Sequence, residues 1–180
     1  FNHMTTFNEL IQQNCFSTDQ EAKDRAAIEL EHQYSCEVNC IEIDPSVQFA
    51  HHGRGSIIIA AKICSGVVIS QNVTIGSNQK FNRLTNQWEN LGSPVLGPNV
   101  IVADGAKILG PIIIGANSVI GAGAIITKDV PSDSIAYGVN KIKARDPHFD
   151  LVFHNPMPQR DQLIQASQEV IERYNHHLDN

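Results

Sequence analysis

The feature that most constrains this chain is a six-residue repeat that runs without a slip from Leu96 to Pro131. An aliphatic residue recurs at every sixth position, and a small or β-branched residue usually follows four positions after it. A period of six fits neither an α-helix nor a β-strand. It predicts a mainly β fold, a parallel β-helix of hexapeptide repeats in which each aliphatic residue points inward. The predicted inward residues are Leu96, Val102, Ile108, Ile114, Ile120 and Ile126, and their partners are Val100, Ala106, Ile112, Ser118, Ala124 and Val130.

The repeat extends toward the N-terminus but fails once near two adjacent histidines. The count begins at Ile43, reaches Phe49 and finds its next aliphatic residue at Ile57, eight positions on instead of six. His51 and His52 lie inside this interruption. An imidazole with a pKa near neutrality can take a proton from a hydroxyl or an amine. We therefore expect catalysis here, with a plain solvated corner as the alternative.

The count fails a second time between Ile75 and Leu96, a gap of 21 residues. Residues 77–94 have no inward aliphatic residues in phase, are rich in Asn and Gln, and contain the single tryptophan, Trp88. This pattern predicts a loop extruded from the coil, and long loops in compact repeats usually carry function. Trp88 could stack on a sugar ring, although a lone Trp is more often a packing residue.

We expect three parts along the chain. These are an N-terminal helical segment over 1–40, a β-helix domain over 41–146 and a C-terminal helical tail over 147–180. The tail should form a helix after Pro158, packed on the β-helix or on another subunit. Its apolar stripe is Leu163, Ile164, Val170, Ile171, Tyr174 and Leu178.

Two helix starts are predicted in the N-terminal segment. Thr5 and Thr6 can cap the first helix, because a threonine hydroxyl accepts from the free N–H groups of the first turn. Thr18 and Glu21 occupy capping-box positions for the second helix.

Charge and composition exclude several function classes. The formal net charge is −6 and no basic stripe is present, so no nucleic-acid partner is expected. No run is apolar enough to span a membrane, and we expect no signal peptide before the first helix, which favours a cytoplasmic protein. His32, Cys36 and Cys40 are spaced by four and could hold zinc on one helix face. Small buried residues are the commoner cause of such a stripe, so no metal is expected.

From Ile41 to Asp146 the chain resembles the hexapeptide-repeat acyltransferases, and most closely their serine O-acetyltransferase branch. The resemblance implies a left-handed β-helix, a homotrimer, and acetyl-CoA as co-substrate between neighbouring subunits. It is carried by VTIG (73–76), GAKILG (105–110), IGAGAIITKDVP (120–131) and YGVNK (137–141).

The resemblance also implies roles for individual residues. The family's catalytic histidine is followed by two residues and a glycine, a pattern that His52 fits and that leaves His51 as the other candidate. Glu42 matches the position of the acid that orients the histidine, with Asp44 as the alternative. The residues that match acetyl-CoA-binding positions are Ala103, Asp104, Ala122, Thr127, Lys128 and Lys141.

Three departures from the family pattern bear on the acceptor and the cofactor. Serine acetyltransferases carry an acid where this chain has His51, and an Arg-His pair where it has Gly92 and Ser93. Their usual proline near the end of the coil is Asn140 here. The missing charged groups favour a sugar hydroxyl, as on a surface polysaccharide precursor, over serine as the acceptor of an O-acetyltransferase.

Several alternatives remain open. They are a serine O-acetyltransferase of cysteine biosynthesis, an amino-sugar N-acetyltransferase, a zinc carbonic anhydrase on the same scaffold and a non-enzymatic assembly subunit. The zinc enzyme would need three histidines from adjacent coils, and only His51 and His52 lie in the coils.

Overall fold

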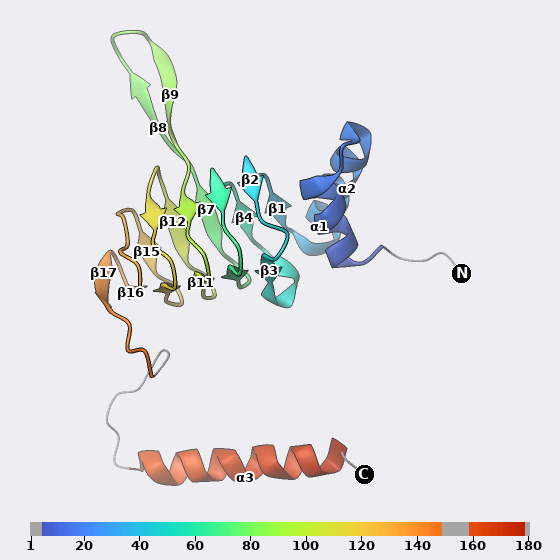
Figure 1. The fold of residues 1–180 in the computed structure, drawn as a ribbon, viewed down its shortest axis with the longest axis vertical. Helices are drawn as coiled ribbons and strands as arrows, with labels where there is room; N and C mark the ends of the chain where they lie inside the picture. The colour runs from blue at the N-terminus through green and yellow to red at the C-terminus, as the bar shows by residue number, and fades with distance from the viewer. Residues whose placement is uncertain (1–4, 149–158, 179–180) are drawn as a thin grey trace. The chain divides into compact units, whose positions relative to one another are not determined.

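The computed structural model describes residues 5–148 and 159–178. The chain divides into two units, residues 1–150 and 151–180, which are considered separately. The first unit is a β-helix with two helices at its N-terminal end (Figure 1). The second contains helix α3 (Arg160–Leu178), which begins two residues after the predicted Pro158.

Three parallel sheets form the walls of the coil, and each turn of the chain visits them in the order A, B, C. Only the last pair, β16 with β17, is antiparallel within these walls. Sheet A holds β1 (Glu37–Val38), β4 (Ile57–Ile58), β7 (Thr74–Gly76), β12 (Lys107–Leu109) and β15 (Ile125–Ile126). Sheet B holds β2 (Glu42–Ile43), β5 (Lys62–Ile63), β10 (Val95–Leu96) and β13 (Ile113–Ile114). Sheet C holds β3 (Gln48–Phe49), β6 (Val68–Ile69), β11 (Ile101–Val102), β14 (Val119–Ile120), β16 (Ser134–Tyr137) and β17 (Lys141–Ala144).

The predicted inward column is confirmed for the whole regular stretch. All six aliphatic residues from Leu96 to Ile126 are fully buried, as are their six partners or nearly so. Each stacks directly on its counterpart in the next coil: Leu96 lies between Ile63 and Ile114. At about 1.5–3 kcal/mol for each buried aliphatic side chain, this column is the main source of stability.

The prediction for Ile57 was wrong by one residue. Ile57 points outward and is 45% exposed, whereas Ile58 is fully buried and occupies the column. The cause is a short 3-10 turn, η1 (Ala50–Gly53), which lengthens the step from Phe49 to Ile58 to nine residues. The following step to Ile63 is only five residues, so the phase is recovered.

The coil also begins earlier than the count suggested. Strand β1 precedes Ile43 and pairs with β4, and its Val38 is buried among the core residues. Counting by sixes along the sequence missed strand β1, because the step from Val38 to Ile43 is five residues, not six.

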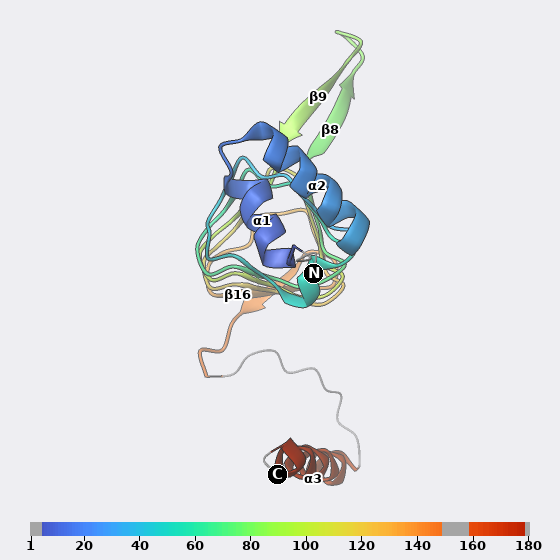
Figure 2. The same ribbon diagram turned by 90° about the vertical axis from the view of Figure 1, so that its right-hand side faces the viewer.

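Two helices close the N-terminal end of the coil, α1 (Phe7–Phe16) and α2 (Gln20–Tyr34) (Figure 2). The Thr6 capping box with Glu9 confirms the predicted start of α1. The predicted cap of α2 was wrong: Asp19, not Thr18, accepts from the Glu21 N–H. The apolar faces that cover the open end of the core are Phe7, Leu10, Ile11, Ala26 and Leu30.

A ladder of polar side chains fixes the turns between sheets B and C. Asn99 donates to Asn117 at 3.2 Å, and Asn117 donates to Asp133 at 3.2 Å. All three residues have left-handed backbone, which asparagine and aspartate tolerate better than other side chains. The equivalent position in the preceding coil is Gly66. A Cβ added to Gly66 would collide with the Asn99 Oδ1 atom.

Gly66→Ala should therefore lower the free energy of unfolding by about 3 kcal/mol, because left-handed strain and overpacking add together. Gly123→Ala is the matched control, since Gly123 has a similar φ of +65° and an added Cβ there meets nothing within 4 Å. It should cost only about 1 kcal/mol. Thermal unfolding at equal protein concentration measures both, and equal losses would contradict the ladder's role.

Candidate active site

The adjacent histidines lie where the chain turns from sheet C into sheet A. His51 and His52 follow β3 and precede β4, and both side chains are exposed. The same turn in later coils carries Asn72, Asp104 and Gly123, which are joined by hydrogen bonds from coil to coil. We call this corner the histidine edge (residues 50–56, 70–72, 103–105 and 121–123).

The backbone of both histidines is left-handed. His51 has a φ of 52° and His52 a φ of 58°, and Gly53 follows with 56°. A non-glycine residue in this region costs about 1–2 kcal/mol, and successive residues there are rare. Such strain persists only where the surroundings impose it, and it concentrates at functional sites. The histidines are therefore the leading candidates for chemistry.

The two histidines have different surroundings. The His52 ring lies 5.3 Å from the Phe7 ring and 5.4 Å from the Tyr34 ring, between centroids. The Arg54 guanidinium lies over the Tyr34 ring, 5.1 Å from its centroid. These contacts hold the His52 imidazole in one orientation while its edge stays exposed to solvent. His51 is exposed at the apex of the turn.

Within one chain the predicted acid does not lie beside the histidines. Glu42 belongs to sheet B, across the core from the histidine edge, and its carboxylate pairs with the Lys62 Nζ at 3.0 Å. Asp44 lies at the corner between sheets B and C, where it accepts from the Ser46 N–H and hydroxyl. The bond from the Ser46 hydroxyl lowers the pKa of Asp44.

Sequence reasoning missed Glu37, the carboxylate that the topology brings nearer to the histidines. Glu37 is exposed on β1 of sheet A and pairs in register with Ile57, just after the histidine turn. Glu37 was missed because the six-residue count did not include strand β1. Extending the count back from Ile43 to the inward Val38 would have placed Glu37 on this sheet.

Five of the six predicted acetyl-CoA residues fall on two corners that border sheet A, and Lys141 lies on β17 of sheet C. Ala103, Asp104 and Ala122 lie along the histidine edge, in its later coils, where the neighbouring residues are glycines and Gly123 faces open space. Thr127 and Lys128 lie at the opposite corner, after β15. The chain therefore presents small side chains at one border of the sheet and positive charge at the other.

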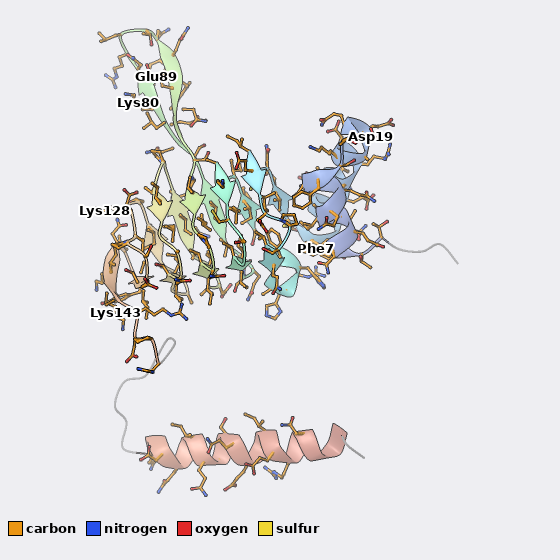
Figure 3. All side chains as sticks on the ribbon, in the orientation of Figure 1. Phe7, Asp19, Lys80, Glu89, Lys128 and Lys143 are labelled. Atoms are coloured by element: carbon orange, nitrogen blue, oxygen red, sulfur yellow. The ribbon has the colours of Figure 1, made fainter. Side chains whose placement is uncertain are left out.

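Asn140 closes the last coil beside these residues. Its side chain accepts from the Thr127 N–H and donates to the Thr127 hydroxyl, both at 2.8 Å. Asn140 has a φ of 53°, a conformation that proline cannot adopt. This local geometry explains why asparagine stands where the resembled family has proline. Lys141 follows at the start of β17, and Lys128 and Lys143 mark this end of the coil (Figure 3).

The predicted loop over 77–94 is confirmed as extruded from the coil, but it is an ordered hairpin of β8 (Asn78–Asn82) and β9 (Gln87–Gly92). It leaves the corner between sheets A and B, on the far side of sheet A from the histidine edge (Figure 1). Neighbouring residues on a strand point to opposite faces, so the hairpin has two faces with different side chains.

The two faces of the hairpin differ in chemistry. On one face Lys80 pairs with Glu89 at 3.3 Å (Figure 3), and Asn82 also donates to Glu89. The Asn82 and Lys80 bonds lower the pKa of Glu89. On the other face Phe81 and Trp88 pack edge to face at 5.5 Å, and Trp88 is 69% exposed. The aromatic face of the two strands therefore carries no charged side chain, since Lys80 and Glu89 pair on the other face and Arg83 lies in the turn.

The helical interpretation of the possible zinc ligands was wrong. Helix α2 ends at Tyr34, so Cys36 and Cys40 lie beyond the helix that carries His32. Burial raises the pKa of the Cys36 thiol to about 12 and that of Cys40 to about 11, so both stay protonated at neutral pH. Among the described residues, no three His, Cys, Asp or Glu side chains converge as metal ligands would.

None of the described helices combines the length and the apolarity needed to cross a bilayer.

Comparison with known proteins supports the repeat and the resemblance. Residues 93–128 match the family model "Bacterial transferase hexapeptide (six repeats)". The serine acetyltransferase of Synechococcus elongatus is 33% identical over 132 residues, which cover 69% of this chain and 51% of that protein. The chain thus spans about half the length of this curated relative.

Solved structures support the fold. A serine acetyltransferase in complex with cysteine aligns with a TM-score of 0.58 at 22% identity, over 81% of this chain and 60% of that one. A serine acetyltransferase in complex with CoA aligns with a TM-score of 0.52 at 24% identity, over 75% and 55% of the two chains. These alignments confirm the predicted left-handed parallel β-helix.

Removing the backbone strain at the histidine turn should stabilise the fold. His51→Gly should raise the free energy of unfolding by up to about 1 kcal/mol, because glycine adopts a φ of 52° without steric cost. His51→Ala is the control and should give no gain, since it keeps the strain. Thermal unfolding of the two variants measures the difference. Equal stabilities would mean that the turn is unstrained.

Proposed function

We propose that this chain, a hexapeptide-repeat protein similar in sequence to the serine acetyltransferases, is an acetyl-CoA-dependent O-acetyltransferase. The observation that carries the proposal is the pair of left-handed histidines on a corner shared with three of the predicted acetyl-CoA residues, Ala103, Asp104 and Ala122. The family match and the similarity to serine acetyltransferases support the reaction class.

His52 is proposed as the general base. Its imidazole takes the proton of the acceptor hydroxyl, and the hydroxyl oxygen attacks the thioester carbonyl carbon of acetyl-CoA. The carbon–sulfur bond then breaks and the CoA thiol leaves with the proton, so no covalent enzyme intermediate is required. Phe7 and Tyr34 orient the ring through their contacts. His51 is the alternative base.

A carboxylate that holds the imidazole tautomer completes this arrangement. Glu42 and Asp44 remain the sequence-based candidates, but each already has a partner on another wall or corner of its own chain. Glu37 is the candidate that the topology of sheet A favours. Separate Glu37→Gln and Glu42→Gln variants rank the two acids by their loss of acetyl transfer.

The residues that border sheet A suit acetyl-CoA. Ala103 and Ala122 leave room for the pantetheine arm to lie against backbone, and Asp104 belongs to the same edge. Lys128 and Lys141 supply positive charge for phosphates. Thr127 is anchored by Asn140 beside them.

A homotrimer with its sites between subunits is proposed on the resemblance. Exposed aliphatic side chains on the walls, such as Ile57, Ile113 and Ile125, support an assembly that covers them. The histidine edge and the hairpin lie on opposite borders of sheet A, so two copies placed side by side can contribute both to one site.

Serine is the first acceptor to test, because the similar proteins are named serine acetyltransferase. A saccharide hydroxyl is the second candidate, and the exposed Phe81–Trp88 face favours it. Serine carries two charges that need charged partners, whereas Lys80 and Glu89 of the hairpin pair with each other and only Arg83, in the turn, adds a further charge there. An amino-sugar N-acetyltransferase would use the same base.

His52→Ala should reduce acetyl transfer by about 10²–10⁴-fold, the usual contribution of a general base. His51→Ala is the matched control and should keep most of the rate. Release of the CoA thiol measures transfer, and calorimetry of CoA binding shows that the site is intact. Full activity of His52→Ala would reassign the base, and failure of the unmodified protein to bind CoA would favour a non-enzymatic role.

The hairpin should decide the acceptor. Trp88→Ala should lower turnover of saccharide acceptors about fivefold if a sugar ring stacks there, since a stacked aromatic contact is worth about 1 kcal/mol. Turnover of serine should hardly change. Leu84→Ala is the control, because Leu84 is 99% exposed at the hairpin turn. A chain that acetylates serine and no saccharide would leave serine as the acceptor.

A further inference from the structure

Helix α3 carries an exposed apolar stripe. Ile164 is 39% exposed, Val170 55% and Ile171 56%. At about 100° per residue these three side chains and Ser167 fall within one third of the helix circumference. Ile164 and Ile171 are separated by seven residues, the spacing at which a helix repeats its contact with another helix.

The chemistry of α3 favours a protein partner over a membrane. Its sequence holds two arginines and three acidic residues and no lysine, so it lacks the basic face that anionic lipids attract. A helix of 19 residues gains most of its stability from packing of its apolar face. The exposed stripe therefore requires a protein surface.

The borders of the stripe carry opposite charges. Glu172 and Asp161 lie beyond the border formed by Ile164 and Ile171, and Arg173 lies beyond the border formed by Val170. In a parallel, cyclic packing of identical helices, the acidic border of one helix faces the basic border of the next. The charges at the two borders of the α3 stripe are therefore complementary between identical parallel helices.

We propose that α3 is an assembly element that packs in parallel against α3 of the other copies of this chain, forming a three-helix bundle with Ser167 near its axis. The stoichiometry rests on the proposed trimer. In such a trimer the three helices are tethered to one body, and this raises their effective concentration.

Disulfide trapping tests this packing in the full chain. Ser167→Cys in the centre of the stripe should give disulfide-linked pairs on mild oxidation with diamide. Gln165→Cys on the outer face is the matched control and should stay unlinked, as should the unmodified chain. No linkage through Cys at 167, or equal linkage at both positions, would overturn the proposal. Packing of α3 on the β-helix would leave the cysteine at position 167 unlinked.

A second pair of variants separates the bundle from the trimer. Ile171→Asp should abolish amide-exchange protection in α3, because it places a charge inside the bundle, whereas Gln165→Asp should preserve that protection. Light scattering and CoA-thiol release should show that both variants remain active trimers. Protection that survives Ile171→Asp would overturn the bundle. A monomeric or inactive unmodified protein would instead overturn the proposed function and the stoichiometry.

Discussion

The structure depends on the stacking of one coil on the next. Within the regular stretch, an inward aliphatic residue such as Ile108 lies between equivalents in the two neighbouring coils and is fully buried. Backbone hydrogen bonds between parallel strands hold the same register, and the Asn99–Asn117–Asp133 ladder fixes it at a corner. Since every coil is completed only by its neighbours, irregular segments are accommodated where they can project outward.

The two interruptions are of this kind, and they carry the features that a bare scaffold lacks. The histidine turn keeps two residues in left-handed conformation, a cost that the stacked coils around it offset. The hairpin projects from the other border of sheet A and exposes Trp88. The regular coil thus gives a rigid support, and the histidine turn and the hairpin lie at the two borders of its sheet A.

The predictions that succeeded were those set by local pattern. The buried column from Leu96 to Ile126 and the Thr6 cap follow from periodicity and from side-chain chemistry within a few residues. Local pattern placed Ile57 in the core instead of Ile58, because the length of the η1 turn decides which side chain faces inward. It also placed the cap of α2 at Thr18, whereas the neighbouring Asp19 accepts from the Glu21 N–H. Glu42 was placed by similarity of motif, and its wall of the coil could not be read from the motif.

The sequence by itself determined the repeat, the inward column and the two places where the repeat fails. Those features depend on spacing along the chain. Only the tertiary structure decided that Glu42 faces Lys62 on sheet B while Glu37 lies on sheet A, which the histidine turn borders. The reason is that residues few positions apart lie on different walls of a coil, whereas residues about 20 apart lie side by side, and a single five-residue step changes the wall.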